Sequence, residues 1–146
     1  MGMFRTFYRR IRQLFSARFF HHESLFKGSI LIIDDDPDIA FVIERVLKLK
    51  GCIVYKATGP RTFEKAQALI KDINFDIIFL DLMLNDANGM DILRYIKEFC
   101  RYSHVIIVTG NLSMLSGITS YVGVLQKPFE ISDFDEILTK HKIPTL

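Results

Sequence analysis

From Ser29 onward the chain alternates between short apolar runs and segments with helical periodicity. Runs such as 30–33 and 105–108 lack the polar alternation of a strand that has one face in water. Continuous apolar strands of this length are typical of a parallel sheet covered by helices on both faces. The alternation therefore predicts an α/β fold built on a doubly wound, parallel sheet.

The same pattern gives approximate bounds for each element. Five strands are expected at 30–33, 52–56, 75–80, 105–108 and 121–125. Helices are expected at 37–50, after the turn at 58–60, at 89–99 and at 130–140, whereas residues 110–120 support one or two helical turns. Asp36 and Pro37 have the residue types of a helix N-cap and first turn, and Gly51 is suited to end that helix.

Charge divides the chain into two unequal parts. Residues 1–27 carry six basic side chains and one acidic one, whereas residues 28–146 carry thirteen basic and sixteen acidic side chains. We therefore expect a basic arm at 1–27, a slightly acidic domain at 28–142 and a short tail at 143–146.

The arm has the pattern of an amphipathic helix within residues 4–20. Its apolar side chains fall in one broad stripe, and most of its arginines lie on the other side. Three interpretations stay open: contact with protein, either its own domain or a second copy in a homodimer; binding to a membrane surface; and a poorly ordered extension. No DNA-reading fold is recognisable, so specific nucleic-acid binding is not expected.

Cysteine and apolar content indicate a cytoplasmic protein. Cys52 and Cys100 have no metal-ligand spacing and are expected to be buried free thiols. No apolar run approaches the roughly 20 residues of a membrane span, and arginines interrupt the apolar residues of the N-terminus. His104 and His141 are expected on the surface.

Polar side chains follow the ends of four of the predicted strands. Asp34 and Asp35 follow the first, and Asp81, Thr109 and Lys127 follow the third, fourth and fifth. A parallel sheet brings these ends to one edge, where such folds bind ligands. Converging carboxylates favour a hard cation such as Mg²⁺, and an ionised carboxylate is a nucleophile toward phosphorus. Each feature alone is ordinary, as a cap, a turn or a structural threonine, but their order is specific.

Taken together, these residues resemble the receiver domain of response regulators in two-component signalling, over about residues 28–142. The strings that carry the resemblance are Ile30–Pro37, Asp76–Leu84, Asn88-Gly89, Val108-Thr109-Gly110 and Lys127-Pro128-Phe129. The resemblance implies a five-stranded flavodoxin-like fold of the chemotaxis-regulator type, here with an extra N-terminal amphipathic helix.

The resemblance also implies roles for individual residues. Asp81 would be the phosphoacceptor, with Thr109 and Lys127 contacting the phosphoryl group. Mg²⁺ would be held by Asp34, Asp35, Asp81 and the backbone carbonyl of Met83. Gly110 would keep the site open beside Thr109. The phosphodonor would be a histidine kinase or a histidine phosphotransfer protein, and the output protein is unknown.

Three departures from the family pattern bear on signalling. Asn85 occupies a position where proline is common, with a small expected effect. Only seventeen residues separate Thr109 from Lys127, fewer than usual by about one helical turn. Val124 stands where an aromatic switch residue is usual, and the nearest aromatic residue is Tyr121.

Two functional hypotheses follow, with a third disfavoured. The first is a stand-alone receiver that signals through protein contacts, with no enzymatic reaction beyond its own phosphorylation and dephosphorylation. The alternative is a receiver-fold scaffold or adaptor, which the arm anchors or dimerises and in which phosphorylation is uncoupled from output. A Mg²⁺-dependent phosphatase of similar topology generally needs a second aspartate two residues after the nucleophile, where this chain has Met83.

Overall fold

The computed structural model describes residues 28–119, 121 and 123–141. The predicted N-terminal helix and arm at 1–27 and the tail at 143–146 lie outside the described residues. Among the residues described, no helix has both the length and the apolar character needed to cross a bilayer.

Strands and helices alternate along the described chain. The elements in order are β1 (Ser29–Ile33), α2 (Pro37–Leu49), β2 (Ile53–Ala57), α3 (Thr62–Asp72), β3 (Ile77–Asp81), α4 (Gly89–Phe99), β4 (His104–Thr109), the 3-10 helix η1 (Leu112–Leu115), β5 (Gly123–Gln126) and α5 (Ile131–Lys140).

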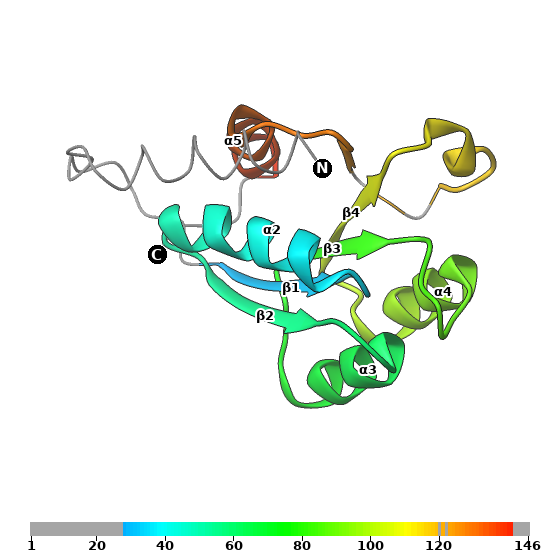
Figure 1. The fold of residues 1–146 in the computed structure, drawn as a ribbon. Helices are drawn as coiled ribbons and strands as arrows, with labels where there is room; N and C mark the ends of the chain where they lie inside the picture. The colour runs from blue at the N-terminus through cyan, green and yellow to red at the C-terminus, as the bar shows by residue number, and fades with distance from the viewer. Residues whose placement is uncertain (1–27, 120, 122, 142–146) are drawn as a thin grey trace.

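The five strands form one parallel sheet in the order β2-β1-β3-β4-β5. Helices α2 and α5 cover one face of the sheet, and α3 and α4 cover the other (Figure 1). The strand order reverses between β1 and β3, which is where such sheets bind ligands. The predicted flavodoxin-like fold is confirmed.

Alternation along each strand supplies both faces of the core. In β1, Ile30 and Ile32 pack in the cluster under α2 and α5, whereas Leu31 and Ile33 pack in the cluster under α3 and α4. Successive side chains of a strand point to opposite faces, so a strand buried on both sides must be apolar at every position. The continuous apolar runs in the sequence therefore mark the central strands.

Helix α2 begins and ends at the residues that the sequence indicates. The Asp36 side chain accepts hydrogen bonds from the backbone N–H groups of Asp38 and Ile39, and Pro37 is the first helical residue. At the other end, Gly51 has a positive φ of 83°. The N–H of Gly51 bonds to the carbonyl of Lys48, and that of Cys52 to the carbonyl of Leu47, which is a Schellman motif.

Elsewhere the predicted bounds are displaced by one or two residues, and β5 starts at Gly123 rather than at residue 121. The segment between β4 and β5 contains the 3-10 helix η1, in agreement with its weak helical pattern. Met114, Leu115 and Ile118 of this segment pack against the cluster under α3 and α4. These three side chains cover that part of the sheet, where the described residues form only the short helix η1.

The prediction that His141 lies on the surface is wrong. His141 is buried, and its ring contacts that of His104 in an edge-to-face arrangement with centroids 5.4 Å apart. Burial, then the neighbouring His104 and Lys140, lower the pKa of His141. Cys52 is a buried free thiol as expected, and burial raises its pKa to about 12, whereas Cys100 is only half-buried.

The loop between β3 and α4 folds back tightly on itself. Asn88 caps α4 by accepting a hydrogen bond from the N–H of Met90 at 2.8 Å, and Met83 and Asn88 form an isolated antiparallel bridge. A Cβ atom at Gly89 would lie 2.7 Å from the carbonyl oxygen of Leu82. Only glycine fits at this position without a shift of the backbone that follows Asp81.

We expect Gly89→Ala to destabilise the protein by about 1–3 kcal/mol, because the added methyl group must displace backbone rather than a flexible side chain. Urea unfolding would measure the loss of stability, and the dependence of the free energy of unfolding on urea concentration should be unchanged. Gly110→Ala is the matched control, since a Cβ there makes only an ordinary 3.9 Å contact with Lys127. A Gly89→Ala chain as stable as the Gly110→Ala chain would contradict this account of the loop.

Candidate functional site

Three carboxylates gather where β1 and β3 end. Asp81 is the last residue of β3, and Asp34 and Asp35 follow β1 directly. The two strands are parallel neighbours, paired from Ile30 with Ile77 to Ile33 with Leu80, so their carboxyl ends coincide. One oxygen atom from each of the three side chains lies within 4.8 Å of the others.

Asp34 is the most deeply buried of the three, with 1% of its surface exposed. Its Oδ1 accepts a hydrogen bond from the N–H of Asp36 at 2.9 Å. Its Oδ2 is buried and has no hydrogen-bond partner among the described residues. The Lys127 ammonium lies 3.7 Å from that oxygen, which is close enough for attraction but too far for a hydrogen bond.

Burial raises the pKa of Asp34 from an ordinary 3.8 to about 7. The hydrogen bond from Asp36 and the charge of Lys127 act in the opposite direction, while the carboxylates of Asp81 and Asp35 add to the rise. A buried carboxylate beside two others is costly to ionise without additional positive charge.

Asp81 is held at both of its oxygen atoms. The N–H of Met83 donates to Oδ1 at 2.8 Å, and the Lys127 ammonium lies 3.4 Å from Oδ2. Lys127 itself follows β5, and its own N–H donates to the carbonyl of Thr109 at 2.8 Å. Pairing of the two last strands thus places one ammonium group between the carboxylates of Asp34 and Asp81.

The Thr109 hydroxyl is engaged outside the carboxylate cluster. It donates to the carbonyl of Asn111 at 3.2 Å and accepts from the N–H of the same residue at 3.0 Å. The Asn111 side chain in turn accepts from the N–H and hydroxyl of Ser113, and so caps η1. Thr109 is therefore linked to the segment between β4 and β5.

Asn85 makes a contact that sequence reasoning missed. Its backbone N–H donates to Oδ2 of Asp35 at 3.1 Å, which joins the loop after β3 to the acidic pair. Proline, which is common at this position in the family, has no N–H and cannot make the bond. The replacement by asparagine therefore adds a restraint on Asp35, and only its departure from proline signalled this in the sequence.

The structure thus brings together Asp34, Asp35, Asp81 and Lys127, as predicted. Asp81 pairs with Val108 of β4, and Thr109 is the next residue of that strand. The metal-ligand role of the Met83 carbonyl stays a prediction, and the Met83 side chain is exposed. Gly110 is not required sterically, because a Cβ there would fit.

The donor set suits a hard dication. Three carboxylates face a single ammonium group, and a buried oxygen of Asp34 has no hydrogen-bond donor in the described part of the chain. Oxygen ligands with space for water on an exposed side are what Mg²⁺ prefers in proteins. The arrangement is able to hold such an ion and to present Asp81 to a phosphoryl group.

Comparison with known proteins gives a family match over most of the chain. Residues 30–139 match the family model of the response regulator receiver domain. The chain is 30% identical over 114 residues to the DNA-binding transcriptional regulator NtrC of Proteus hauseri, covering 73% of this chain and 23% of that protein. It is 33% identical over 122 residues to the transcriptional regulatory protein DcuR of Escherichia coli, covering 76% and 48%. The chain therefore spans less than half the length of these relatives.

Solved structures agree on the fold. The response regulator TrrA of Thermotoga maritima, in complex with Mg²⁺ and BeF, has a TM-score of 0.69 at 21% identity, covering 78% of this chain and 98% of that one. The chemotaxis response regulator CheY4 of Vibrio cholerae has a TM-score of 0.65 at 20% identity, and the match covers 79% of this chain and 98% of that one.

The raised pKa of Asp34 predicts a pH-dependent stability for the metal-free protein. Between about pH 4 and 7 the folded chain keeps a proton on Asp34 that the unfolded chain releases. Stability should therefore fall as pH rises through this window and level off above it. Asp34→Asn does not titrate, so it should gain stability relative to the wild type, on the order of 2 kcal/mol, between pH 5 and 8.

Urea unfolding in the presence of a chelator, at pH 5 and pH 8, measures this difference. Titrating groups that do not interact with Asp34 cancel when the two chains are compared at each pH. If the free energies of unfolding of the wild type and the variant differed by the same amount at both pH values, Asp34 would not be a carboxyl group whose ionisation burial disfavours.

Proposed function

Because the chain belongs to the family of response regulator receiver domains, we propose that it accepts a phosphoryl group on Asp81 from a phosphohistidine. The donor would be a histidine kinase or a histidine phosphotransfer protein. The single observation that carries the proposal is the position of Asp81, with one oxygen bonded to the Met83 N–H and the other beside the Lys127 ammonium.

The chemistry needs little from the chain beyond positioning. An oxygen of the Asp81 carboxylate attacks phosphorus, the new O–P bond forms, and the N–P bond to the donor imidazole breaks. The imidazole leaves with the bonding electron pair, and it ends as a neutral ring because its other nitrogen already carries a proton. No general base is needed, since the nucleophile carries no proton when ionised. Lys127, whose ammonium lies near two carboxylates, would neutralise a phosphoryl oxygen as a compact charge.

Thr109 would complete the phosphorylated state. A hydrogen bond from its hydroxyl to a phosphoryl oxygen requires the group to give up its donation to the Asn111 carbonyl. Because Asn111 also caps η1, this exchange would disturb the segment between β4 and β5. We propose this segment as the first part of the chain to respond to phosphorylation.

Mg²⁺ is the proposed cofactor, with Asp34, Asp35, Asp81 and the backbone carbonyl of Met83 as ligands. When bound, the ion would neutralise carboxylate and phosphoryl charge together. Support comes from the buried, unpartnered oxygen of Asp34 and from the three convergent carboxylates. The Thermotoga maritima regulator of the same fold is described in complex with Mg²⁺ and BeF.

Output through protein contacts is the remaining part of the proposal. The relatives named above are transcriptional regulators more than twice as long as the part matched here. We propose no reaction on a separate substrate, only formation and loss of the phosphoryl group at Asp81.

A receiver-fold scaffold is the second candidate. It is favoured by the shortness of η1, which is the helix that the described residues form between β4 and β5, and by Val124 in place of an aromatic residue. Phosphorylation that leaves both assembly and partner binding unchanged would favour this candidate.

Incubation with acetyl phosphate and Mg²⁺, followed by intact-mass measurement, tests the proposed function. The wild type should gain the mass of one phosphoryl group, and Asp81→Asn should gain none, because the nucleophile is removed. Asp72→Asn is the control, since Asp72 is an exposed carboxylate at the end of α3. A chelator should suppress the wild-type reaction. Equal phosphorylation of the wild type and Asp81→Asn would overturn the proposal.

A further inference from the structure

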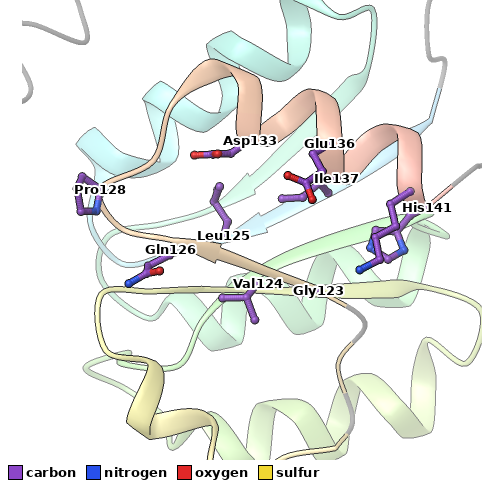
Figure 2. Close-up of a pocket in the computed structure, with 10 residues that line it drawn as sticks. Gly123, Val124, Leu125, Gln126, Pro128, Asp133, Glu136, Ile137 and His141 are labelled. Carbon is purple, nitrogen blue, oxygen red and sulfur yellow. The ribbon is translucent and has the colours of Figure 1, made fainter.

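A polar pocket lies between β5 and α5 at the edge of the sheet, and its lining extends to Gln126 and Pro128, the residues on either side of Lys127. Its volume is about 330 Å³, and its lining includes Gly123, Leu125, Asp133, Glu136, Ile137 and His141. Figure 2 shows Leu125 directed toward the helix, whereas Val124 points to the opposite side of the strand. We call this site the β5–α5 pocket.

Gly123 is closely packed at one end of the pocket, between Ile106 and His141. A Cβ atom there would lie 2.9 Å from Cδ1 of Ile106 and 3.2 Å from Nε2 of His141. Strand β5 is also the last strand of the sheet, so nothing in the described chain pairs with its outer edge. Gln126, Glu136 and Lys140 of the lining are exposed, so the pocket is accessible from the outside of the domain.

Negative charge predominates around the pocket. Helix α5 and its N-cap carry four acidic residues and one lysine, and of these Asp133, Glu136 and Lys140 line the pocket. Asp133 is engaged in the N-terminal capping box, and Asp135 pairs with Lys50. Glu136 is exposed on the pocket rim and has no ion pair with any other described residue. The rim therefore offers an unpaired carboxylate above an apolar floor formed by Leu125 and Ile137.

The chain itself contains a segment of matching chemistry. Residues 4–20 carry five arginines and no acidic residue, interleaved with aromatic and aliphatic side chains. An arginine joins a cationic head to an apolar stem, which suits a site with a carboxylate rim and an apolar floor. Ligand pockets in proteins start at about 300 Å³. The volume of the β5–α5 pocket is close to this lower end, so it fits an anchoring side chain rather than a whole helix.

The connection is long enough for this segment to reach its own domain. Gly28 precedes β1, and the amino ends of β1 and β5 lie at the same end of the parallel sheet. Three strand spacings separate β1 from β5, which is about 14 Å. The seven residues 21–27 span up to roughly 23 Å when extended. A short tether also gives the arm a high effective concentration at its own domain.

We propose that residues 4–20 dock on the β5–α5 pocket of the same chain, with arginine side chains against Glu136 and apolar side chains against the pocket floor. This inference goes beyond the proposed function and does not depend on phosphorylation of Asp81. A docked arm would cover α5 and the outer edge of β5, the strand that leads into Lys127.

Photo-crosslinking of the full chain tests the proposal. A benzophenone amino acid in place of Phe7, followed by peptide mapping, should give crosslinks to residues 123–141 in the monomer fraction. Glu136→Lys should lower their yield roughly threefold, because an exposed charge pair becomes a repulsion. Glu98→Lys, at an exposed position on α4 over the other face of the sheet, is the matched control and should have no effect.

A second variant makes the test independent of the pocket residues. Replacement of Arg9, Arg10 and Arg12 by glutamine should lower the same crosslinks and speed amide exchange in α5. Crosslinks confined to a dimer fraction would overturn the proposal in favour of a second copy. Crosslinks that form only to lipid, when vesicles of phosphatidylcholine and phosphatidylglycerol are added, would overturn it in favour of a membrane surface. Crosslinks to 123–141 that are unaffected by both charge changes would also contradict it.

Discussion

The site depends on one unbalanced charge arrangement. Three carboxylates meet at the ends of β1 and β3, and a single ammonium group, that of Lys127, lies between two of them. Ionisation is most costly at Asp34, since one of its oxygens is buried and lacks a hydrogen-bond donor in the described chain. Its pKa rises to about 7 because ionisation in this position is unfavourable. A dication would relieve that cost and prepare Asp81 for a phosphoryl group.

The sheet is what makes this arrangement possible. Parallel pairing of β1 with β3 and of β4 with β5 brings residues far apart in the chain to one edge. The backbone bond from Lys127 to the Thr109 carbonyl fixes the start of the lysine side chain. The Thr109 hydroxyl, in contrast, is engaged by Asn111, which caps η1. The strand ends therefore position the carboxylates and Lys127, whereas the Thr109 hydroxyl is bonded to the loop that follows β4.

Much of this was predictable from local patterns in the sequence. Continuous apolar runs marked the central strands, and Asp36, Pro37 and Gly51 marked the ends of α2. The strand-end positions of Asp34, Asp81 and Lys127 followed from the parallel sheet alone.

The features that were missed depend on tertiary contacts. The bond from the Asn85 N–H to Asp35 is made by backbone, so only the absence of proline at this position signals it. The burial of His141 depends on its packing against His104 and beside Gly123, across the edge of the sheet. The hydrogen bond from the Thr109 hydroxyl to Asn111 likewise depends on how the chain turns after β4.

A crystal structure with Mg²⁺ and beryllofluoride would test the central claim most directly. The account predicts an ion in contact with the carboxylates of Asp34 and Asp81, and a fluoride beside the Lys127 ammonium. It also predicts that the Thr109 hydroxyl leaves the carbonyl of Asn111 and turns toward the bound group. An ion bound elsewhere, or beryllofluoride absent from Asp81 at saturating concentration, would contradict it.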